Sequence, residues 1–294
     1  MDFAKAEQKG RDTVLSGTRF FDLQQTLDNG QAFRWARVSG ADENKTAAQK
    51  FSHFTGIAHG RRLELVFCKN ALTIKNCSLE EFEAVWKKYF DFTRCYEEIH
   101  SRLSEFSQEK NARENEILRR AINFAPGLRL LRQDVWEVLI SFILSQNSNI
   151  PRIKKMVESL CENFGEKSAC GGFAFPSAEK LAALNAADLA PIKCGYRAAY
   201  VVDAARRVAN GEFDIRASEK LSSDKIFREL LKIRGVGEKV ADCVLLYGFG
   251  RTERFPKDVW IKRAMTEFFP DGFPREIENI AGIAQQFLFF YVRS

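Results

Sequence analysis

The 294-residue sequence lacks long apolar runs, paired cysteines and a large excess of charge of either sign. Its longest apolar stretches, such as 244–249 and 287–292, are far shorter than the ~20 residues that a membrane-spanning helix needs. The seven cysteines are scattered without a Cys-x-x-Cys pair, which argues against a zinc ribbon or an iron–sulfur cluster. Reduced thiols in a cytosolic compartment are the better interpretation. The first twelve residues are charged and contain no apolar core, so we expect no secretion signal.

What the sequence does contain is enough apolar material for folded cores, with 45% hydrophobic and 29% charged residues. At ~150 residues per domain, its length suggests about two domains. Lys and Arg number 45 against 39 Asp and Glu, and the net charge of +6 hints at a polyanionic partner.

The first part of the chain is rich in strand patterns. Between Phe20 and Phe67, short alternating segments such as 33–35 and 62–67 are separated by polar turns, and 72–76 is typical of a last strand. An antiparallel sheet is the best fit, with 39–50 as an exposed hairpin loop. A helix then begins after Ser78, and Glu81 is expected to complete its capping box. We therefore predict a β-rich domain over 1–100.

The remainder, 101–294, has mostly helical periodicity, so the predicted class is α+β. Asp134 is placed to cap a core helix over 134–147, and Asn149 with Pro151 is suited to starting the next helix. Six further helices are expected at 177–187, 197–209, 222–233, 238–247, 258–268 and 276–291.

The segment 230–246 contains two short helical patterns joined by Gly235, Val236 and Gly237. Such a glycine-flanked turn can bend sharply and turn backbone N–H groups toward a phosphate. The apolar residues that would pack the two halves together are Leu230, Leu231, Ile233, Val236, Val240, Ala241 and Val244. This arrangement, within about 222–249, resembles the helix-hairpin-helix motif, which binds the DNA backbone without reading sequence. An ordinary helical hairpin is the alternative.

Lys239 follows this turn, and Asp258 stands before another predicted helix. A lysine amine can act as a covalent nucleophile, and a carboxylate can stabilise positive charge on a sugar ring. The simpler interpretations are a solvated lysine and a helix N-cap worth about 1 kcal/mol. For Asp258 the two roles are compatible.

The run GVGEKVADC, followed by Pro256, Lys257 and Asp258, resembles the 8-oxoguanine branch of the helix-hairpin-helix DNA glycosylases. The resemblance implies that Lys239 attacks the sugar and forms a Schiff base, with Asp258 assisting. It also implies that Cys243, four residues after Lys239, faces the extruded base. Taken alone, Cys243 would be a small buried residue.

Further segments extend the resemblance along nearly the whole chain. GQAFRW at 30–35 matches the family signature in which the carbonyl of Gly30 accepts the N7–H of 8-oxoguanine. Gln285 would read the edge of the base and Phe289 would stack on its plane. From the residues alone, GQAFRW could be a turn and a strand. The stretch that contains Gln285 and Phe289 could be a core helix with one polar interruption.

The family's contacts to the cytosine left unpaired match Asn147, Arg152, Tyr196 and Arg197. Tyr196 would be the wedge and Arg197 would hydrogen-bond the cytosine. Otherwise Asn147 would be a turn residue, and the pair 196–197 a core tyrosine beside a surface arginine. Backbone contacts would come from the 235–237 turn and from Trp260, which replaces a usual histidine.

These matches predict a bifunctional DNA glycosylase/AP lyase that excises 8-oxoguanine through a lysine Schiff base. A monofunctional glycosylase and a non-catalytic helix-hairpin-helix DNA-binding protein are the alternatives. We expect no metal or cofactor, no membrane contact, a monomer, and double-stranded DNA containing oxidised guanine as the partner. The location would be the cytoplasm, at the nucleoid, in a bacterium and the nucleus in a eukaryote.

Overall fold

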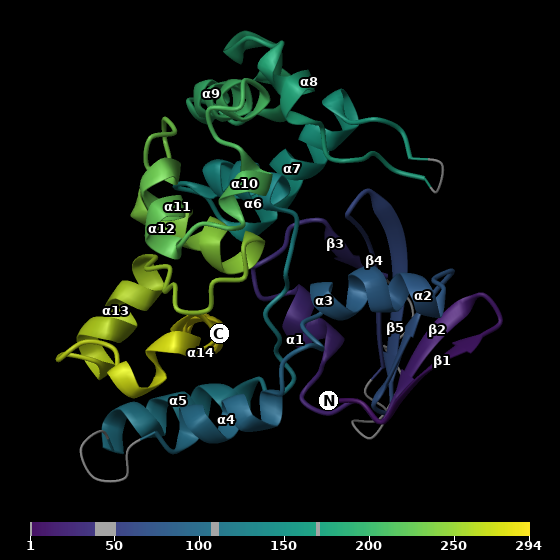
Figure 1. Ribbon diagram of the computed structural model, residues 1–294, viewed down its shortest axis with the longest axis vertical. Coiled ribbons are helices and arrows are strands. Elements are labelled where there is room, and N and C mark those ends of the chain that lie inside the picture. The colour runs from purple at the N-terminus through teal and green to yellow at the C-terminus, as the bar shows by residue number, and fades with distance from the viewer. Residues whose placement is uncertain (1, 39–50, 107–111, 169–170) are drawn as a thin grey trace.

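The computed structural model describes residues 2–38, 51–106, 112–168 and 171–294. An antiparallel six-stranded sheet precedes a helical region, as the predicted α+β class requires (Figure 1). The strand order is β1-β2-β6-β5-β4-β3. The strands are β1 Lys5–Lys9, β2 Asp12–Ser16, β3 Trp35–Arg37, β4 Phe51–Ala58, β5 Arg61–Cys68 and β6 Ala71–Ile74. The predicted hairpin loop at 39–50 lies outside the described residues.

The register of the sheet follows from alternating burial. Leu65 of β5 lies opposite Phe54 of β4 and Ile74 of β6, and all three side chains are fully buried. This one-sided burial explains why 62–67 and 72–76 were recognisable as strands. The predicted strand region began at Phe20, so β1 and β2 were both missed. The charged residues of β1 are partly or fully exposed, and that strand has no apolar pattern.

Two details of the first part differ from expectation. The strand predicted at 33–35 begins only at Trp35, and a short helix, α1 (Leu23–Leu27), occupies part of the region where only strands were expected. Asp22 caps α1 by accepting a hydrogen bond from the Gln25 amide. The buried residues of α1 are Leu23, Thr26 and Leu27, and they follow helical rather than alternating spacing.

The helix after Ser78 consists of α2 (Leu79–Glu81), the π-helical η1 (Phe82–Trp86) and α3 (Lys87–Tyr89). Ser78 accepts from the Glu81 amide, as predicted. The Glu81 carboxylate does not complete the capping box. It accepts instead from the Arg61 guanidinium and the Trp86 indole.

The helical region follows most of the predicted ranges, although α4, α5 and α10 were not among them and η2 extends beyond the helix predicted at 177–187. Its helices are α4 Tyr96–Ser104, α5 Ala112–Phe124, α6 Val135–Ser145, α7 Ile150–Phe164, α8 Ala178–Ala182, η2 Ala186–Ile192, α9 Arg197–Ala209, α10 Ile215–Ser218, α11 Ser223–Leu230, α12 Glu238–Cys243, η3 Val244–Gly248, α13 Val259–Phe268, η4 Arg275–Ile280 and α14 Ala281–Arg293. Asp134 and Asn149 cap α6 and α7 as expected. No helix in the described part of the chain is long and apolar enough to cross a membrane.

Two hydrophobic cores organise the molecule. One core joins the sheet to α2, η1 and α3, and the other fills the helical region and includes Phe33 from the start of the β3 segment. The antiparallel pair α4 and α5 reaches across to α14 near the C-terminus (Figure 1). The domain boundary predicted near residue 100 stays a prediction.

Candidate active site

The turn at 235–237 has the geometry that its glycines imply. Gly235 has φ +82°, and a Cβ there would stand 2.3 Å from the ring of Tyr200. Gly237 is the N-cap of α12 and has open space where a Cβ would lie. The backbone is therefore accessible at Gly237, beside a helix N-terminus that attracts anions.

The predicted apolar frame of this hairpin is buried, with one exception. Val236 and Val240 are 6% and 4% exposed, whereas Leu231 is 40% exposed. Leu231 is the C-cap of α11, where the chain turns away and its side chain leaves the interface. The prediction for Leu231 was therefore wrong.

Lys239 is the second residue of α12 and is partly buried. Its Nζ lies 4.7 Å from the centroid of the Phe142 ring. Phe142 in turn stacks on Tyr247, with 5.4 Å between ring centroids and 11° between planes. An ammonium over an aromatic face is stabilised electrostatically, and the aromatic wall limits where the amine can point.

Cys243 lies one turn after Lys239 and is 2% exposed. Burial raises the pKa of its thiol to about 11, with the Lys239 charge acting in the opposite direction and the Asp258 charge adding to the rise. A hydrogen bond with Lys239 also lowers this pKa, so Lys239 and Cys243 lie side by side, and the charge of Asp258 acts on the same thiol. The roles predicted for these three residues stay predictions. At neutral pH the thiol carries its proton.

Asp258 also has the structural role expected of it. Its carboxylate accepts a 2.8 Å hydrogen bond from the Ile261 amide and caps α13. A carboxylate fixed in this way has little freedom to turn, so its negative charge stays near the Cys243 side of the site.

Gly30 and Phe289 also face each other. Gly30 has φ +88°, and a Cβ there would stand 2.6 Å from Ile150 and 3.5 Å from Phe289. Gln285 is 3% exposed and donates to the Pro256 carbonyl, while its Oε1 has no partner among the described residues. An unpaired buried acceptor of this kind is costly unless a ligand supplies a donor.

The residues matched to the unpaired cytosine form a second group. Asn147 is exposed in the left-handed region with φ +46°, and Tyr196 is 54% exposed. Arg197 is 3% exposed, lies over the Tyr196 ring and donates to the carbonyls of Gln146, Asn147 and Cys194. Tyr196 is thus exposed and Arg197 is buried. This is the reverse of the alternative in which a core tyrosine stands beside a surface arginine.

Arg152 is exposed on the first turn of α7. On α13, Trp260 is 42% exposed and carries the guanidinium of Arg263 5.6 Å from its ring. Lys257, just before the Asp258 cap, is exposed. These three side chains are exposed and accessible to a polyanion.

Sequence reasoning missed three contributors. Phe142 was assigned only to a helix core, Gln146 donates to the Gly235 carbonyl, and Arg293 covers the Phe289 ring at 5.2 Å. The spacing of four residues between Phe289 and Arg293 was a readable signal. The partners of Phe142 and Gln146 are distant in sequence, so no local spacing predicted those contacts.

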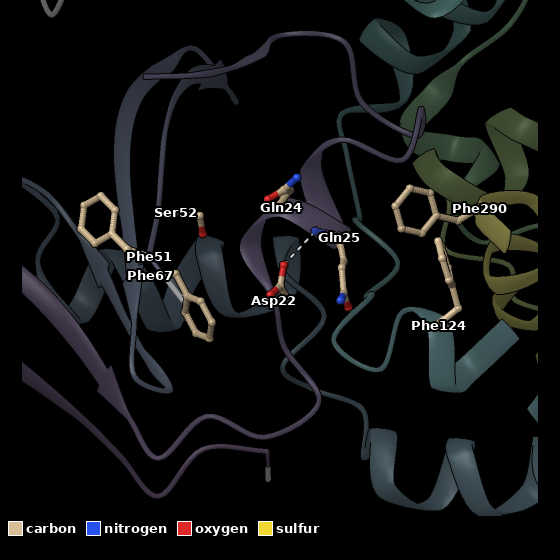
Figure 2. Close-up of a pocket in the computed structure, with 8 residues that line it drawn as sticks. All are labelled: Asp22, Gln24, Gln25, Phe51, Ser52, Phe67, Phe124 and Phe290. Atoms are coloured by element: carbon tan, nitrogen blue, oxygen red, sulfur yellow. Dashed lines mark hydrogen bonds between the residues drawn. The ribbon is translucent and has the colours of Figure 1, made fainter. Parts of the chain in front are cut away.

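A separate cavity of about 340 Å³ lies between the sheet and the C-terminal helix. Figure 2 shows Phe124 and Phe290 on one side of it, and Phe51 and Phe67 on the other. It contains none of the predicted site residues.

Comparison with known proteins identifies the family to which this chain belongs. The family model for the N-terminal domain of 8-oxoguanine DNA glycosylase matches residues 14–139, and that for HhH-GPD superfamily base excision DNA repair proteins matches 140–284. A probable N-glycosylase/DNA lyase of Methanothermobacter thermautotrophicus is 30% identical over 93% of this chain and 94% of that protein. The N-glycosylase/DNA lyase of Arabidopsis thaliana is 27% identical over 85% of this chain and 67% of that protein.

Among solved structures, the 8-oxoguanine glycosylase/lyase of Clostridium acetobutylicum, in complex with double-stranded DNA containing cytosine opposite 8-oxoguanine, superposes with a TM-score of 0.86. It is 34% identical, and the match covers 100% of this chain and 99% of that one. This chain therefore belongs to the 8-oxoguanine DNA glycosylase family of helix-hairpin-helix base excision repair proteins.

Proposed function

We propose that this protein excises 8-oxoguanine from duplex DNA and then cleaves the strand at the resulting abasic site. The observation that carries the proposal is Lys239, held over Phe142 with the Cys243 thiol beside it and the charge of Asp258 acting on that thiol, in a chain of this family. Duplex DNA containing oxidised guanine is the proposed partner, and the protein is proposed to act as a monomer.

The reaction begins when the neutral Lys239 amine attacks C1′ of the extruded nucleotide. The glycosidic C–N bond breaks, and the base leaves with the electron pair and takes up a proton. Asp258 stabilises the positive charge that develops on the sugar. The amine, having lost a proton, then forms an imine with C1′ as the C1′–O4′ bond breaks and O4′ takes up a proton, and loss of a C2′ proton expels the 3′ phosphate by β-elimination.

Base selection is assigned to the group around Gly30. Its carbonyl accepts the N7–H that 8-oxoguanine has and guanine lacks, while the Gln285 amide bonds the edge of the base. Phe289 stacks on one face of the ring. The unpaired Oε1 of Gln285 supports this role, because a base donor would satisfy it.

The DNA is held by two surfaces. The amides of 235–237 and the Trp260 indole bind backbone phosphates, and the exposed Tyr196 enters the stack beside the cytosine. Asn147 and Arg152 bind that cytosine. Arg197 orients the 146–147 turn through its carbonyl hydrogen bonds and also hydrogen-bonds the cytosine.

Borohydride trapping tests the nucleophile. With a duplex containing 8-oxoguanine opposite cytosine, the wild type should form a covalent adduct, and Lys239→Gln should form none while still binding the duplex. The control is Lys232→Gln, which removes the same charge from an exposed position on the other side of the turn and should trap normally.

An adduct with Lys239→Gln would contradict the assignment of the nucleophile. Base release without any adduct in the wild type would indicate a monofunctional glycosylase that uses water. An intact 8-oxoguanine duplex, bound with a steep salt dependence, would indicate a non-catalytic binding protein.

A further inference from the structure

A second cavity lies between α7 and the strands β3 and β4, away from the reactive lysine. Its volume is about 410 Å³, which lies in the usual range for small-molecule sites. It is lined by Phe33, Arg34, Trp35, Ala36, Thr55, Gly56, Ile57, Arg62, Lys154, Lys155, Glu158 and Gly172. We call it the β4–α7 cavity.

The charge around the β4–α7 cavity is strongly positive, with four cationic side chains and one carboxylate, Glu158. Lys154 is engaged with Asp28 and the Trp35 carbonyl. Arg62 and Lys155 are exposed, and neither forms a salt bridge with another described residue. Two uncommitted cations at a cavity rim favour an anionic ligand.

Arg34 provides an independent observation inside the β4–α7 cavity. Its side chain is 2% exposed, and it donates to the Phe173 carbonyl and lies 3.9 Å from Glu137. Its Nε is buried and has no partner among the described residues. The Arg34 guanidinium therefore adds an incompletely paired positive charge to the wall of the β4–α7 cavity, and such a charge favours an anion nearby.

Much of the remaining wall of the β4–α7 cavity is apolar. It includes Phe33, Trp35 and Ile57, and the indole N–H of Trp35 is already bonded to the Tyr89 hydroxyl. Gly56 permits this arrangement, since a Cβ there would stand 2.4 Å from the Trp35 ring. A planar aromatic group can pack on such a wall while its charged end reaches the rim.

From these features we infer that the β4–α7 cavity binds a nucleoside phosphate, with the base on the apolar wall and the phosphate between Arg62 and Lys155. The ligand is either a free mononucleotide or a nucleotide of a DNA strand. Phe33 separates this cavity from the reactive site, because it packs edge-on against Phe142, the ring beneath Lys239.

Calorimetric titration with 2′-deoxyadenosine 5′-monophosphate tests the inference. We expect saturable binding of one equivalent, unchanged in Lys239→Gln and weakened at least tenfold in the double variant Arg62→Ala/Lys155→Ala. Deoxyadenosine and inorganic phosphate should each bind more weakly than the nucleotide. The matched control, Lys180→Ala/Arg216→Ala, removes two exposed cations from α8 and α10 and should bind as the wild type does.

A variant that should strengthen binding tests whether misfolding explains the weaker binding of the double variant. Glu158→Lys removes the one carboxylate of the cavity and should tighten binding several-fold. A short single-stranded oligonucleotide distinguishes a free mononucleotide from a nucleotide of a DNA strand as the ligand. If it binds through Arg62 and Lys155 while the mononucleotide does not, the ligand is a nucleotide of DNA. If neither probe binds, or if the double variant and its control bind equally, the inference is overturned.

Discussion

Tyr196 and Arg197 are neighbours in the chain, yet one faces solvent and the other faces the interior. Arg197 is 3% exposed because its guanidinium meets carbonyls from the 146–147 turn and from Cys194. Asn147 holds a left-handed conformation in that turn, which an ordinary residue adopts only at some cost. A side chain that bonds the turn carbonyls stabilises this conformation.

At the scale of single residues, we predict that Arg197→Ala lowers the free energy of unfolding by about 2–4 kcal/mol, because several carbonyls lose a charged donor. Arg152→Ala should change it by no more than about 0.5 kcal/mol, since Arg152 is exposed. Urea unfolding measures both. Equal stability of the two variants would show that Arg197 does not hold the turn.

The hairpin of α11 and α12 is an element whose two glycines serve different purposes. Gly235 needs its positive φ and the space that Tyr200 leaves, while the Gln146 amide bonds its carbonyl. Gly237 has an ordinary φ of −97° and open space around it. The first glycine is therefore required for folding, and the second leaves room for a phosphate.

We expect Gly235→Ala to destabilise the protein by about 2–3 kcal/mol, from the left-handed conformation and the clash with Tyr200. Gly237→Ala should cost no more than about 1 kcal/mol, the difference between glycine and alanine at an N-cap. It should instead weaken binding to undamaged duplex, measured by fluorescence anisotropy. If Gly237→Ala binds duplex normally, the turn does not contact the phosphates.

For the whole molecule, the junction between the sheet segment and the helical core contains a partly buried acid. Glu137 of α6 lies 3.9 Å from Arg34, and burial raises the pKa of its carboxyl from 4.5 to about 7. The charges of Asp134 and Glu158 add to the rise, while Arg34 opposes it. The folded protein therefore binds this proton more tightly than the unfolded chain does.

The protonated Glu137 carboxyl makes its full contribution to the free energy of unfolding below pH 4.5. This contribution is lost as the pH rises through about 7. Glu137→Gln, which cannot ionise, should gain up to about 3 kcal/mol relative to the wild type between pH 5 and pH 8. Melting temperatures at the two pH values measure the difference. The exposed Glu98→Gln is the control, and a pH-independent difference for Glu137→Gln would contradict the raised pKa.

Features that depend on near neighbours in the chain were predictable from the residues alone. Ser78, Asp134, Asn149 and Asp258 were recognisable as caps because an N-cap bonds an amide only two or three residues away. The hairpin and the spacing of Lys239 and Cys243 were also readable, because one helical turn places them together. The α+β class followed from the change of periodicity along the chain.

Contacts between residues that are distant in the chain could be found only in the folded structure. Phe142 lies beneath Lys239 across nearly a hundred residues of chain, and Arg197 reaches a turn some fifty residues away. The β4–α7 cavity likewise exists only because a sheet segment and α7 approach each other. Such contacts depend on how whole elements pack, and local propensity carries no information about them.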